Sequence, residues 1–483
     1  MSYLGIDLGT SGLRALLIGE DGKSIGSAEK HYNVSNPQAG WSEQNPQHWI
    51  DALDGAIGEL KKQHSEFSEL KGIGVAGHMH GATLLSADGA VLRPCILWND
   101  TRSYKEAAIL DALPNVRELS GNIVFPGFTA PKLEWVKNNE PDIYAKVAKV
   151  LLPAAYLNFY LTGSYVADMS DSAGTSWLDC SARVWSDELL KAGHMRRDQM
   201  PSLVEGCEVS GELKSELQQK WGLSNTVIIA GGAGDNAAAA CGIGALDEGQ
   251  GFVSLGTSGV ILAARNAYVP DPATAVHTFC HAVPDRWYQM GVMLSATDSL
   301  NWLAGITGTK QSELTSALGD KVLPPSSVRF LPYLSGERTP HNDAEIRGGF
   351  TGLATSTNHH DMTQAVIEGV SFGLRDSLAA LQSTGAKLDG LTAIGGGSAS
   401  HYWLQLLATI LGLPLHLPKG HEFGAALGAA RLGQVTAKSI APEDVIVAPE
   451  ISQTIDPVST LQPQFDEAYQ NFRLAYSGLK AIQ

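Results

Sequence analysis

One pentapeptide, Leu-Gly-Thr-Ser-Gly, occurs twice in this chain of 483 residues, at residues 8–12 and 255–259. The two copies begin 247 residues apart, about half the length of the chain, and each lies between two apolar runs. A motif that recurs with matching flanks at such a spacing indicates an internal duplication. We therefore predict two related α/β halves that face each other across a cleft, with the boundary near residues 244–251.

The order of secondary-structure signals is that of an α/β protein. The apolar runs around the first pentapeptide, followed by an Asp21-Gly22 turn, predict a three-stranded meander. A helix is expected to begin at Pro46 with Asn45 as its N-cap, and a strand is expected over residues 72–77. Residues 465–479 have the pattern of an amphipathic helix. Strands that alternate with helices favour a fold in which helices cover a mixed sheet.

Composition excludes several classes of protein. The chain has 34 Lys and Arg residues against 50 Asp and Glu residues, a net charge of −16, which argues against a nucleic-acid partner. Its five cysteines form no Cys-x-x-Cys pair, as is typical of a reduced cytoplasmic chain. No export signal is visible, and the longest apolar run, residues 237–246, is too short to span a bilayer. We expect a cytoplasmic protein without a membrane partner.

The two Gly-Thr-Ser-Gly turns are candidate phosphate-binding sites. Successive backbone N–H groups of such a turn can point at one anion, and its small side chains allow close approach. A single copy would more simply be a hairpin turn, but two copies in duplicated halves favour phosphate binding.

Asp7 precedes the first of these turns, at the end of an apolar strand. An unpaired carboxylate there is costly unless it meets a cation, so we predict Mg²⁺ bound to Asp7 and to phosphate. An aspartate that caps its own turn is the weaker alternative. The corresponding residue of the second half is Ser254, so a single metal ion is expected.

Residues 226–246 combine an apolar strand, a glycine turn and a small-residue helix, with Asp235 at the turn. A carboxylate at this point can act as the general base for a hydroxyl nucleophile or cap the helix, and both roles can hold at once. Gly232, Gly234 and Ala237 also fit a dinucleotide-binding fingerprint, but the acidic residue required about 20 positions later is absent. Asp235 is thus a candidate base, and a nicotinamide cofactor is not expected.

A further glycine turn, residues 395–397, follows an apolar strand and precedes a helix. It could receive an adenosine or its α-phosphate, although three consecutive glycines more often indicate a close backbone contact. The phosphate-binding motif Gly-x-x-x-x-Gly-Lys-Ser/Thr is absent, because Leu17 stands where its first glycine would be. Phosphate would therefore be held by backbone groups, hydroxyls and metal, with Arg14 as the nearest cation.

His78 and His80 alternate around Met79, but no third ligand lies at a spacing that suits zinc. Contacts to a hydroxylated substrate suit these histidines better. Polar side chains also gather in three other segments, of which we expect a minority to touch ligand: residues 98–102, 168–175 and 335–340. The remaining paired or neighbouring histidines are expected to be structural: His277, His281, His359 and His360.

Two longer patterns carry a family resemblance. Residues 127–139, and residues 348–368 with Gly348, Phe350, Asp361 and Glu368, resemble the two signatures of the FGGY carbohydrate kinases. The resemblance covers nearly the whole chain and implies two duplicated actin-like ATPase (ribonuclease H-like) domains around a central cleft. Residues 1–245 would bind the sugar and supply the base and the first phosphate turn, and residues 246–483 would bind the nucleotide.

The resemblance also implies ATP and Mg²⁺ as cofactors and a small sugar as substrate. It makes Asp235 the catalytic base and Asp7 the residue that organises the metal. The implied contacts at the sugar are Met79, His80, Trp98, Asn236 and Asp235 itself, and those at the nucleotide are Thr10, Ser11, Arg14, Gly256, Thr257, Gly396 and Gly397. A homodimer is the assembly that we consider.

Within the family, segments such as residues 77–85 and 232–242 most resemble ketopentose kinases, with D-xylulose as the expected substrate. Glycerol kinases have Arg-Glu in place of Met79-His80 and Tyr in place of Gly127, and the loss of that Tyr would open room for a longer polyol. One departure is Ala154-Ala155, where relatives often have Lys-Asp.

Several alternatives stay open. Ribulose, another ketose or glycerol could be the substrate, and an actin-like ATPase could act without a sugar. A ribonuclease H-like nuclease is less favoured, because its metal-binding carboxylate cluster is not evident and the net charge of −16 disfavours a polyanionic polymer.

Overall fold

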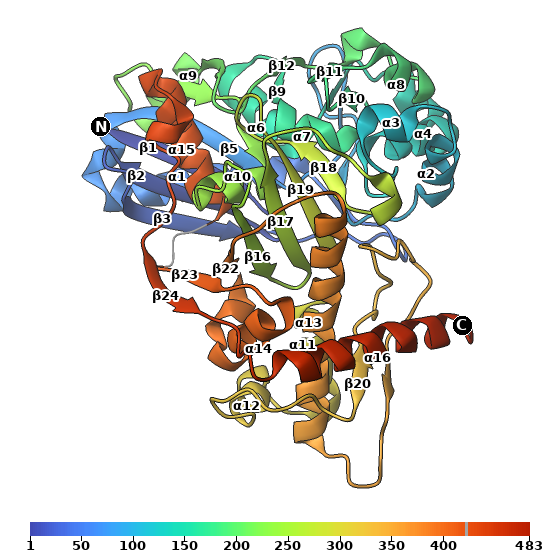
Figure 1. The fold of residues 1–483 in the computed structure, drawn as a ribbon. Helices are drawn as coiled ribbons and strands as arrows, with labels where there is room; N and C mark the ends of the chain where they lie inside the picture. Colours follow the sequence, from blue (N-terminus) through green and yellow to red (C-terminus); the bar gives the residue numbers. More distant parts are fainter. Residues whose placement is uncertain (421–423) are drawn as a thin grey trace.

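The computed structural model describes residues 1–420 and 424–483. Two mixed β-sheets organise it, one in each half of the sequence (Figure 1). In spatial order, the first sheet consists of β13 (Val209–Glu212), β14 (Ile228–Ala230), β5 (Leu70–Gly77), β1 (Ser2–Leu8), β2 (Gly12–Gly19) and β3 (Ser24–His31), with β15 (Ala233–Gly234) also paired to β5. The second consists of β24 (Ile451–Ile455), β23 (Leu415–Pro418), β22 (Leu391–Ile394), β16 (Gly251–Leu255), β17 (Gly259–Arg265), β19 (Trp287–Met293) and β18 (His277–Cys280).

The two sheets share one topology. In each, three neighbouring strands are antiparallel, namely β1-β2-β3 and β16-β17-β19. Two further strands add in parallel to the first strand, β5 and β14 in one sheet and β22 and β23 in the other, before an antiparallel edge strand. Each pentapeptide lies at the first antiparallel turn, with Leu8 paired to Leu13 and Leu255 to Gly259. The predicted duplicated α/β fold is therefore confirmed.

Helices cover both sheets. Helix α1 (Pro46–Gln63) packs on β2 and β3, and its N-cap Asn45 accepts a hydrogen bond from the backbone N–H of Gln47 at 3.0 Å, as the sequence predicts. The other helices of the first half are α2 (Tyr104–Asp111), α3 (Val116–Ser120), α4 (Thr129–Asn139), α5 (Pro141–Tyr144), α6 (Pro153–Thr162), α7 (Met169–Ser172), α8 (Asp187–Ala192), α9 (Ser215–Trp221) and α10 (Asp235–Gly242). The second half adds α11 (Thr297–Thr307), α12 (Gln311–Ser316), α13 (His359–Ser383), α14 (His401–Leu411), α15 (Ala425–Lys438) and α16 (Gln462–Lys480).

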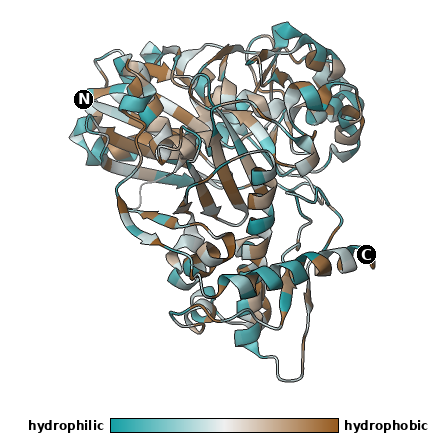
Figure 2. Ribbon diagram, viewed as in Figure 1, coloured by the Kyte–Doolittle hydropathy of each residue, from teal (hydrophilic) through white to brown (hydrophobic). Residues whose placement is uncertain are grey.

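Short strand pairs and 3₁₀ turns complete the fold outside the two large sheets. The pairs are β4 (Glu43–Gln44) with β7 (Cys95–Ile96), β6 (Thr83–Leu85) with β8 (Lys149–Leu151), β9 (Val166–Asp168) with β12 (Ser202–Val204), β10 (Leu178–Asp179) with β11 (Val184–Trp185), and β20 (Arg329–Leu331) with β21 (Gly349–Thr351). Figure 2 shows hydrophobic strands at the centre and hydrophilic residues along outer helices such as α16. Within the described ranges, no helix is long and apolar enough to cross a membrane.

Helix α15 comes from the C-terminal half of the sequence but packs on β1, β5 and β14 of the first sheet (Figure 1). Glycines on the strands allow this approach, because a Cβ atom at Gly5 would overlap the carbonyl oxygen of Ala426, and one at Gly74 that of Ala429. Helix α15 also packs against α10, where a Cβ atom at Gly428 would overlap the carbonyl oxygen of Ala238. The domain boundary near residue 245 stays a prediction, and this helix joins the two halves.

Replacing Gly74 with Ala is expected to lower the free energy of unfolding by about 1–3 kcal/mol, because the added methyl group meets a helix backbone that cannot yield without repacking. Chemical denaturation monitored by circular dichroism measures this change. The matched control is Gly58→Ala in α1, where a Cβ atom meets open space and better helix propensity should raise stability by roughly 0.5–1 kcal/mol. Equal effects of the two substitutions would contradict the close approach of α15.

Candidate active site

Two cavities meet at the second pentapeptide, where Gly256 lines both. The larger, of about 720 Å³, is built from the C-terminal half alone, and the smaller, of about 240 Å³, is lined by residues of both halves. The five residues predicted to contact sugar all line the smaller cavity: Met79, His80, Trp98, Asp235 and Asn236. Four residues predicted to contact nucleotide line the larger one: Gly256, Thr257, Gly396 and Gly397. The structure thus brings the sugar set together and places it beside four of the seven residues predicted to contact nucleotide.

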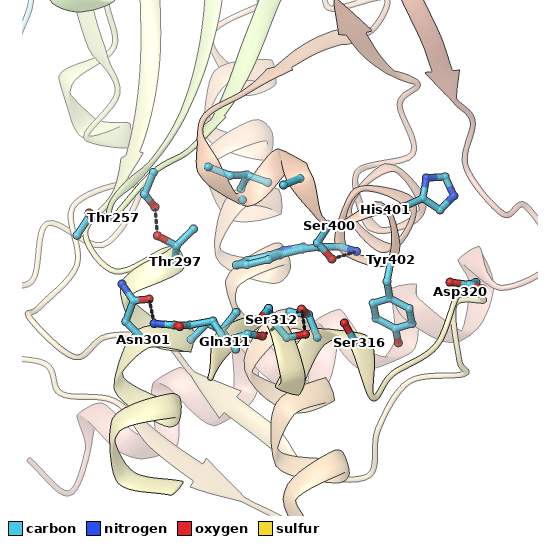
Figure 3. A pocket seen from close by; sticks show the side chains of 18 of the residues that line it. Thr257, Thr297, Asn301, Gln311, Ser312, Ser316, Asp320, Ser400, His401 and Tyr402 are labelled. Atoms are coloured by element: carbon cyan, nitrogen blue, oxygen red, sulfur yellow. Dashed lines mark hydrogen bonds between the residues drawn. The ribbon is translucent and has the colours of Figure 1, made fainter. Parts of the chain in front are cut away.

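Figure 3 shows the larger cavity from close by. Its walls come from α11 (Thr297, Asn301), α12 (Gln311, Ser312, Ser316) and the start of α14 (His401, Tyr402). The hydroxyl group of Thr297 donates to the carbonyl oxygen of Gly256 at 2.8 Å, and the side-chain amide of Gln311 donates to that of Asn301 at 3.0 Å. These polar groups and the glycine turns give the cavity many hydrogen-bonding groups in a space large enough for a nucleotide.

Asp235 begins α10, next to the parallel strand pair β15 and β5. Its Oδ1 accepts hydrogen bonds from the backbone N–H of Asn236 at 2.7 Å and from the side-chain amide of the same residue at 2.9 Å. Burial raises the pKa of Asp235 to about 6, and the two bonds from Asn236 oppose that rise. A carboxylate with such a pKa is largely ionised at neutral pH and is still a good proton acceptor.

Asp7 is the penultimate residue of β1 and lies directly opposite Arg14 of β2 in the antiparallel ladder. Burial raises the pKa of Asp7 to about 7, and the negative charge of Asp235 adds to this rise, whereas the charge of Arg14 lowers it. The charge of Asp235 therefore reaches Asp7. A cation that binds Asp7 would remove part of the cost of ionising it.

The loop that carries Met79 and His80 is held by polar contacts from α4. Lys132, which is fully buried, donates from Nζ to the carbonyl oxygen of His80 at 2.8 Å, and the hydroxyl group of Thr129 donates to the same oxygen at 3.2 Å. Burial lowers the pKa of Lys132 to about 7. Both residues belong to the first family signature, so this signature fixes the backbone of the loop.

The ring of His80 is fixed as well. It stacks on Phe128 with 4.5 Å between centroids, and its Nδ1 donates to the carbonyl oxygen of Gly174 at 2.7 Å, which leaves Nε2 as an acceptor. A Cβ atom at Gly174 would overlap the His80 ring, and one at Gly127 would overlap the carbonyl oxygen of Trp98. Glycine at position 127 therefore also serves close packing beneath the cavity.

The described residues that line the two cavities do not include Asp7, Thr10, Ser11 or Arg14. These four lie at or beside the β1–β2 turn. The indole N–H of Trp98 donates to the hydroxyl oxygen of Thr10 at 3.0 Å, so the first pentapeptide adjoins the wall of the smaller cavity.

Two of the other polar segments have structural roles. Arg102 is buried and pairs with Asp100 and Glu43, each at 2.7 Å, while its guanidinium lies 3.6 Å from the ring centroid of Trp41. In residues 168–175, Asp168 caps α7 and Ser170 accepts the N–H of Gly234 at 3.1 Å, which supports the turn before Asp235.

The histidines expected from the sequence to be structural, and the Ala154-Ala155 pair, lie outside the two cavities. His277 packs against Phe125, and His281 donates to the carbonyl oxygen of Ala245 at 3.1 Å. His359 and His360 begin α13, and neither lines the two cavities. Ala154 and Ala155 are buried in α6, so the departure from Lys-Asp alters packing rather than the surface.

Sequence reasoning missed the α11 and α12 wall and Lys132 as a support. It named residues 335–340 as a candidate segment without singling out Arg338, which lines the smaller cavity. For α11 and α12 no motif exists, since ordinary polar residues on amphipathic helices line the cavity. For Lys132 and Arg338 a signal was present, because one lies in a family signature and the other in residues 335–340.

Comparison with known proteins agrees with this geometry. The chain matches the N-terminal domain of the FGGY family of carbohydrate kinases over residues 2–242 and its C-terminal domain over residues 251–437. It is 47% identical to the xylulose kinase of Escherichia coli (strain K12) over 437 residues, which are 90% of each chain.

Solved structures are similar over the whole chain. A structure described as a xyloylose kinase from Brucella ovis is 55% identical and has a TM-score of 0.98 over 100% of both chains. The xylulose kinase from Rhodospirillum rubrum is 27% identical, with a TM-score of 0.91 over 100% of this chain and 99% of its own. The chain belongs to the FGGY family of carbohydrate kinases.

Proposed function

We propose that this protein transfers the γ-phosphoryl group of ATP to the C5 hydroxyl of D-xylulose, with Asp235 as the general base. The observation that carries the proposal is the shared wall at Gly256, which puts a nucleotide-sized cavity next to a small polar cavity containing Asp235. The similarity to proteins named xylulose kinases supports the choice of sugar.

The smaller cavity suits a short hydroxylated molecule. Asn236, the acceptor nitrogen of His80 and the carboxylate of Asp235 offer hydrogen bonds, while Met79 and Val260 supply apolar wall. Such a mixture holds the carbon chain and orients its hydroxyl groups.

In the reaction, Asp235 accepts the proton of the C5 hydroxyl as its oxygen attacks the γ-phosphorus in line. The new bond joins that oxygen to phosphorus, the bond to the bridging β,γ-oxygen breaks, and ADP leaves with the electron pair. The backbone N–H groups of the Gly256-Thr257 turn lie at the junction of the cavities, where they can stabilise the negative charge on the transferred group.

Asp7 has the chemistry of a magnesium ligand, because Mg²⁺ in nucleotide sites is held by one or two carboxylates together with phosphate oxygens and water. Bound there, Mg²⁺ would neutralise charge on the phosphates. Arg14, opposite Asp7 on β2, would add positive charge at the same edge, and Thr10 and Ser11 would add hydrogen-bond donors. A cytoplasmic location and a homodimer stay predictions from the sequence.

The substrate assignment is tested by ADP release with D-xylulose, D-ribulose, another ketose and glycerol. We expect kcat/KM to be about tenfold or more higher for D-xylulose than for the others, as one misplaced hydroxyl in a hydrogen-bonding site costs at least this much. Preference for another sugar would refute the substrate, and ADP release that no sugar accelerates would favour an actin-like ATPase.

The base assignment is tested by Asp235→Ala and Asp235→Asn. Loss of a general base should lower kcat for D-xylulose by about 10²–10⁴-fold while the circular dichroism spectrum is unchanged. The control is Asp187→Asn, because Asp187 begins α8 on the surface as Asp235 begins α10, and its kcat should match the wild type. A fall of less than about tenfold in both Asp235 variants would show that another group takes the proton.

The pH profile tests the same residue. Asp235 must be ionised to accept a proton and its pKa lies at about 6, so kcat/KM should fall about tenfold per pH unit below that value and level off above it. Asn236→Ala removes a hydrogen bond that lowers this pKa, so its acidic limb should move to higher pH. A limb that keeps its position in Asn236→Ala would mean that a different group controls the profile.

A further inference from the structure

The smaller cavity contains a positive charge to which the mechanism above gives no role. Among the described residues that line this cavity, Arg338 is the one that carries a permanent positive charge. A neutral sugar needs no counterion, so the guanidinium calls for a specific explanation.

The loop around Arg338 is firmly anchored to the second sheet. The carboxylate of Glu337 accepts the backbone N–H groups of Leu294 at 3.0 Å and of Arg338 at 2.8 Å. Thr339 donates its backbone N–H to the carbonyl oxygen of Val292 at 3.0 Å and its hydroxyl to that of Ala275 at 2.9 Å. Arg338 therefore projects from a fixed backbone rather than from a loose loop.

No ion pair joins the guanidinium group to a carboxylate in the described part of the chain, although its charge and that of the neighbouring Glu337 act on each other. It lies over Phe125, 5.0 Å from the ring centroid, and Phe125 in turn packs against His277 at 5.0 Å. Burial is the main cause of the lowered pKa of His80 and of His277, and the charge of Arg338 contributes to both. The guanidinium group thus lies beside these rings, and its N–H donors are not paired with a carboxylate of the described residues.

Arg338 and Asp235 line the same cavity but come from different halves of the chain. The charge of Asp235 acts on Asp7 of β1, whereas Arg338 lies over Phe125, which packs against His277. If the C5 hydroxyl lies at Asp235, as the proposed function requires, then the oxygens at C1 and C2 are left for the other described polar groups of this cavity, and Arg338 is the charged one among them.

The chemistry at C2 separates a ketose from a polyol. A guanidinium only donates hydrogen bonds, and a carbonyl oxygen only accepts them. A hydrogen bond between the two therefore leaves no hydrogen on the carbonyl oxygen in need of an acceptor. A hydroxyl group at C2 of a polyol could also accept, but its own hydrogen would then need an acceptor, and the apolar side chains of Val260 and Val292 that line this cavity offer none. A buried donor without a partner is costly.

We propose that the guanidinium of Arg338 binds the C2 carbonyl oxygen and the neighbouring C1 oxygen of the sugar, and that it selects ketoses over polyols of the same length. The planar fork of arginine suits two adjacent oxygens, which a lysine could not engage in the same way. The inference rests on the proposed function, since it depends on which end of the sugar faces Asp235.

The test pairs a protein change with a substrate change. Arg338→Met removes the charge and keeps an apolar stem beside Phe125, and kcat/KM for D-xylulose is compared with the inhibition constant of xylitol, which has a hydroxyl at C2. We expect kcat/KM for D-xylulose to fall roughly ten- to hundredfold and the inhibition constant of xylitol to change less than about threefold, so that the ketose preference collapses. The KM for ATP should stay the same.

Arg347→Met is the matched control, because Arg347 is an exposed arginine nearby that donates to the carbonyl oxygens of Ala344 and Ile346. It should leave both sugars and ATP unaffected. Arg338→Lys keeps the positive charge but loses the planar guanidinium fork, and we expect the preference for D-xylulose over xylitol to fall several-fold. This variant also tests the proposal if Arg338→Met does not fold.

Three results would overturn the role of Arg338: an unchanged ketose preference in Arg338→Met or Arg338→Lys, an equal loss for both sugars, or a change confined to the KM for ATP. A wild-type protein that phosphorylates no ketopentose would instead refute the proposed function. The two failures are therefore distinct.

Discussion

The contact between α15 and the first sheet fixes the geometry on which the active site depends. Helix α15 rests directly on the strand backbones at Gly5 and Gly74, and Gly428 of the same helix rests on α10. Strand β1 ends near Asp7 and α10 begins with Asp235, so one closely packed helix sets the relation between the two carboxylates. Since a methyl group at these glycines would separate the layers, the spacing of the acidic groups is a consequence of backbone packing.

Much of the fold could be predicted because its signals are local or repeated. The N-cap and apolar face of α1, the Asp-Gly turn between β2 and β3, and the two pentapeptides each lie within a few neighbouring residues. A duplication then supplies long-range information, because whatever the first copy forms, the second should form as well. The shared strand order of the two sheets follows from that argument.

The roles of the remaining site residues could not be predicted from local pattern, even where a sequence signal marked their segment, because tertiary packing gives them these roles. Gln311 and Ser312 are ordinary residues of a short surface helix until α12 folds beside the glycine turns. Lys132 is a buried cation whose partner, the carbonyl oxygen of His80, has no side-chain signature. Arg338 stands among residues that mostly anchor a loop, and only the cavity distinguishes it from them.

The distribution of charge explains why glycine turns matter in this protein. With a net charge of −16, the chain as a whole repels a polyphosphate. Among the described residues that line the larger cavity there is no Lys or Arg, and Asp320 adds a negative charge. Favourable interactions with phosphate within this cavity would therefore come from backbone N–H groups and helix N-termini, which act only at short range. Small residues at 256–257 and 396–397 provide that close approach, which accounts for part of the 52 glycines in the sequence.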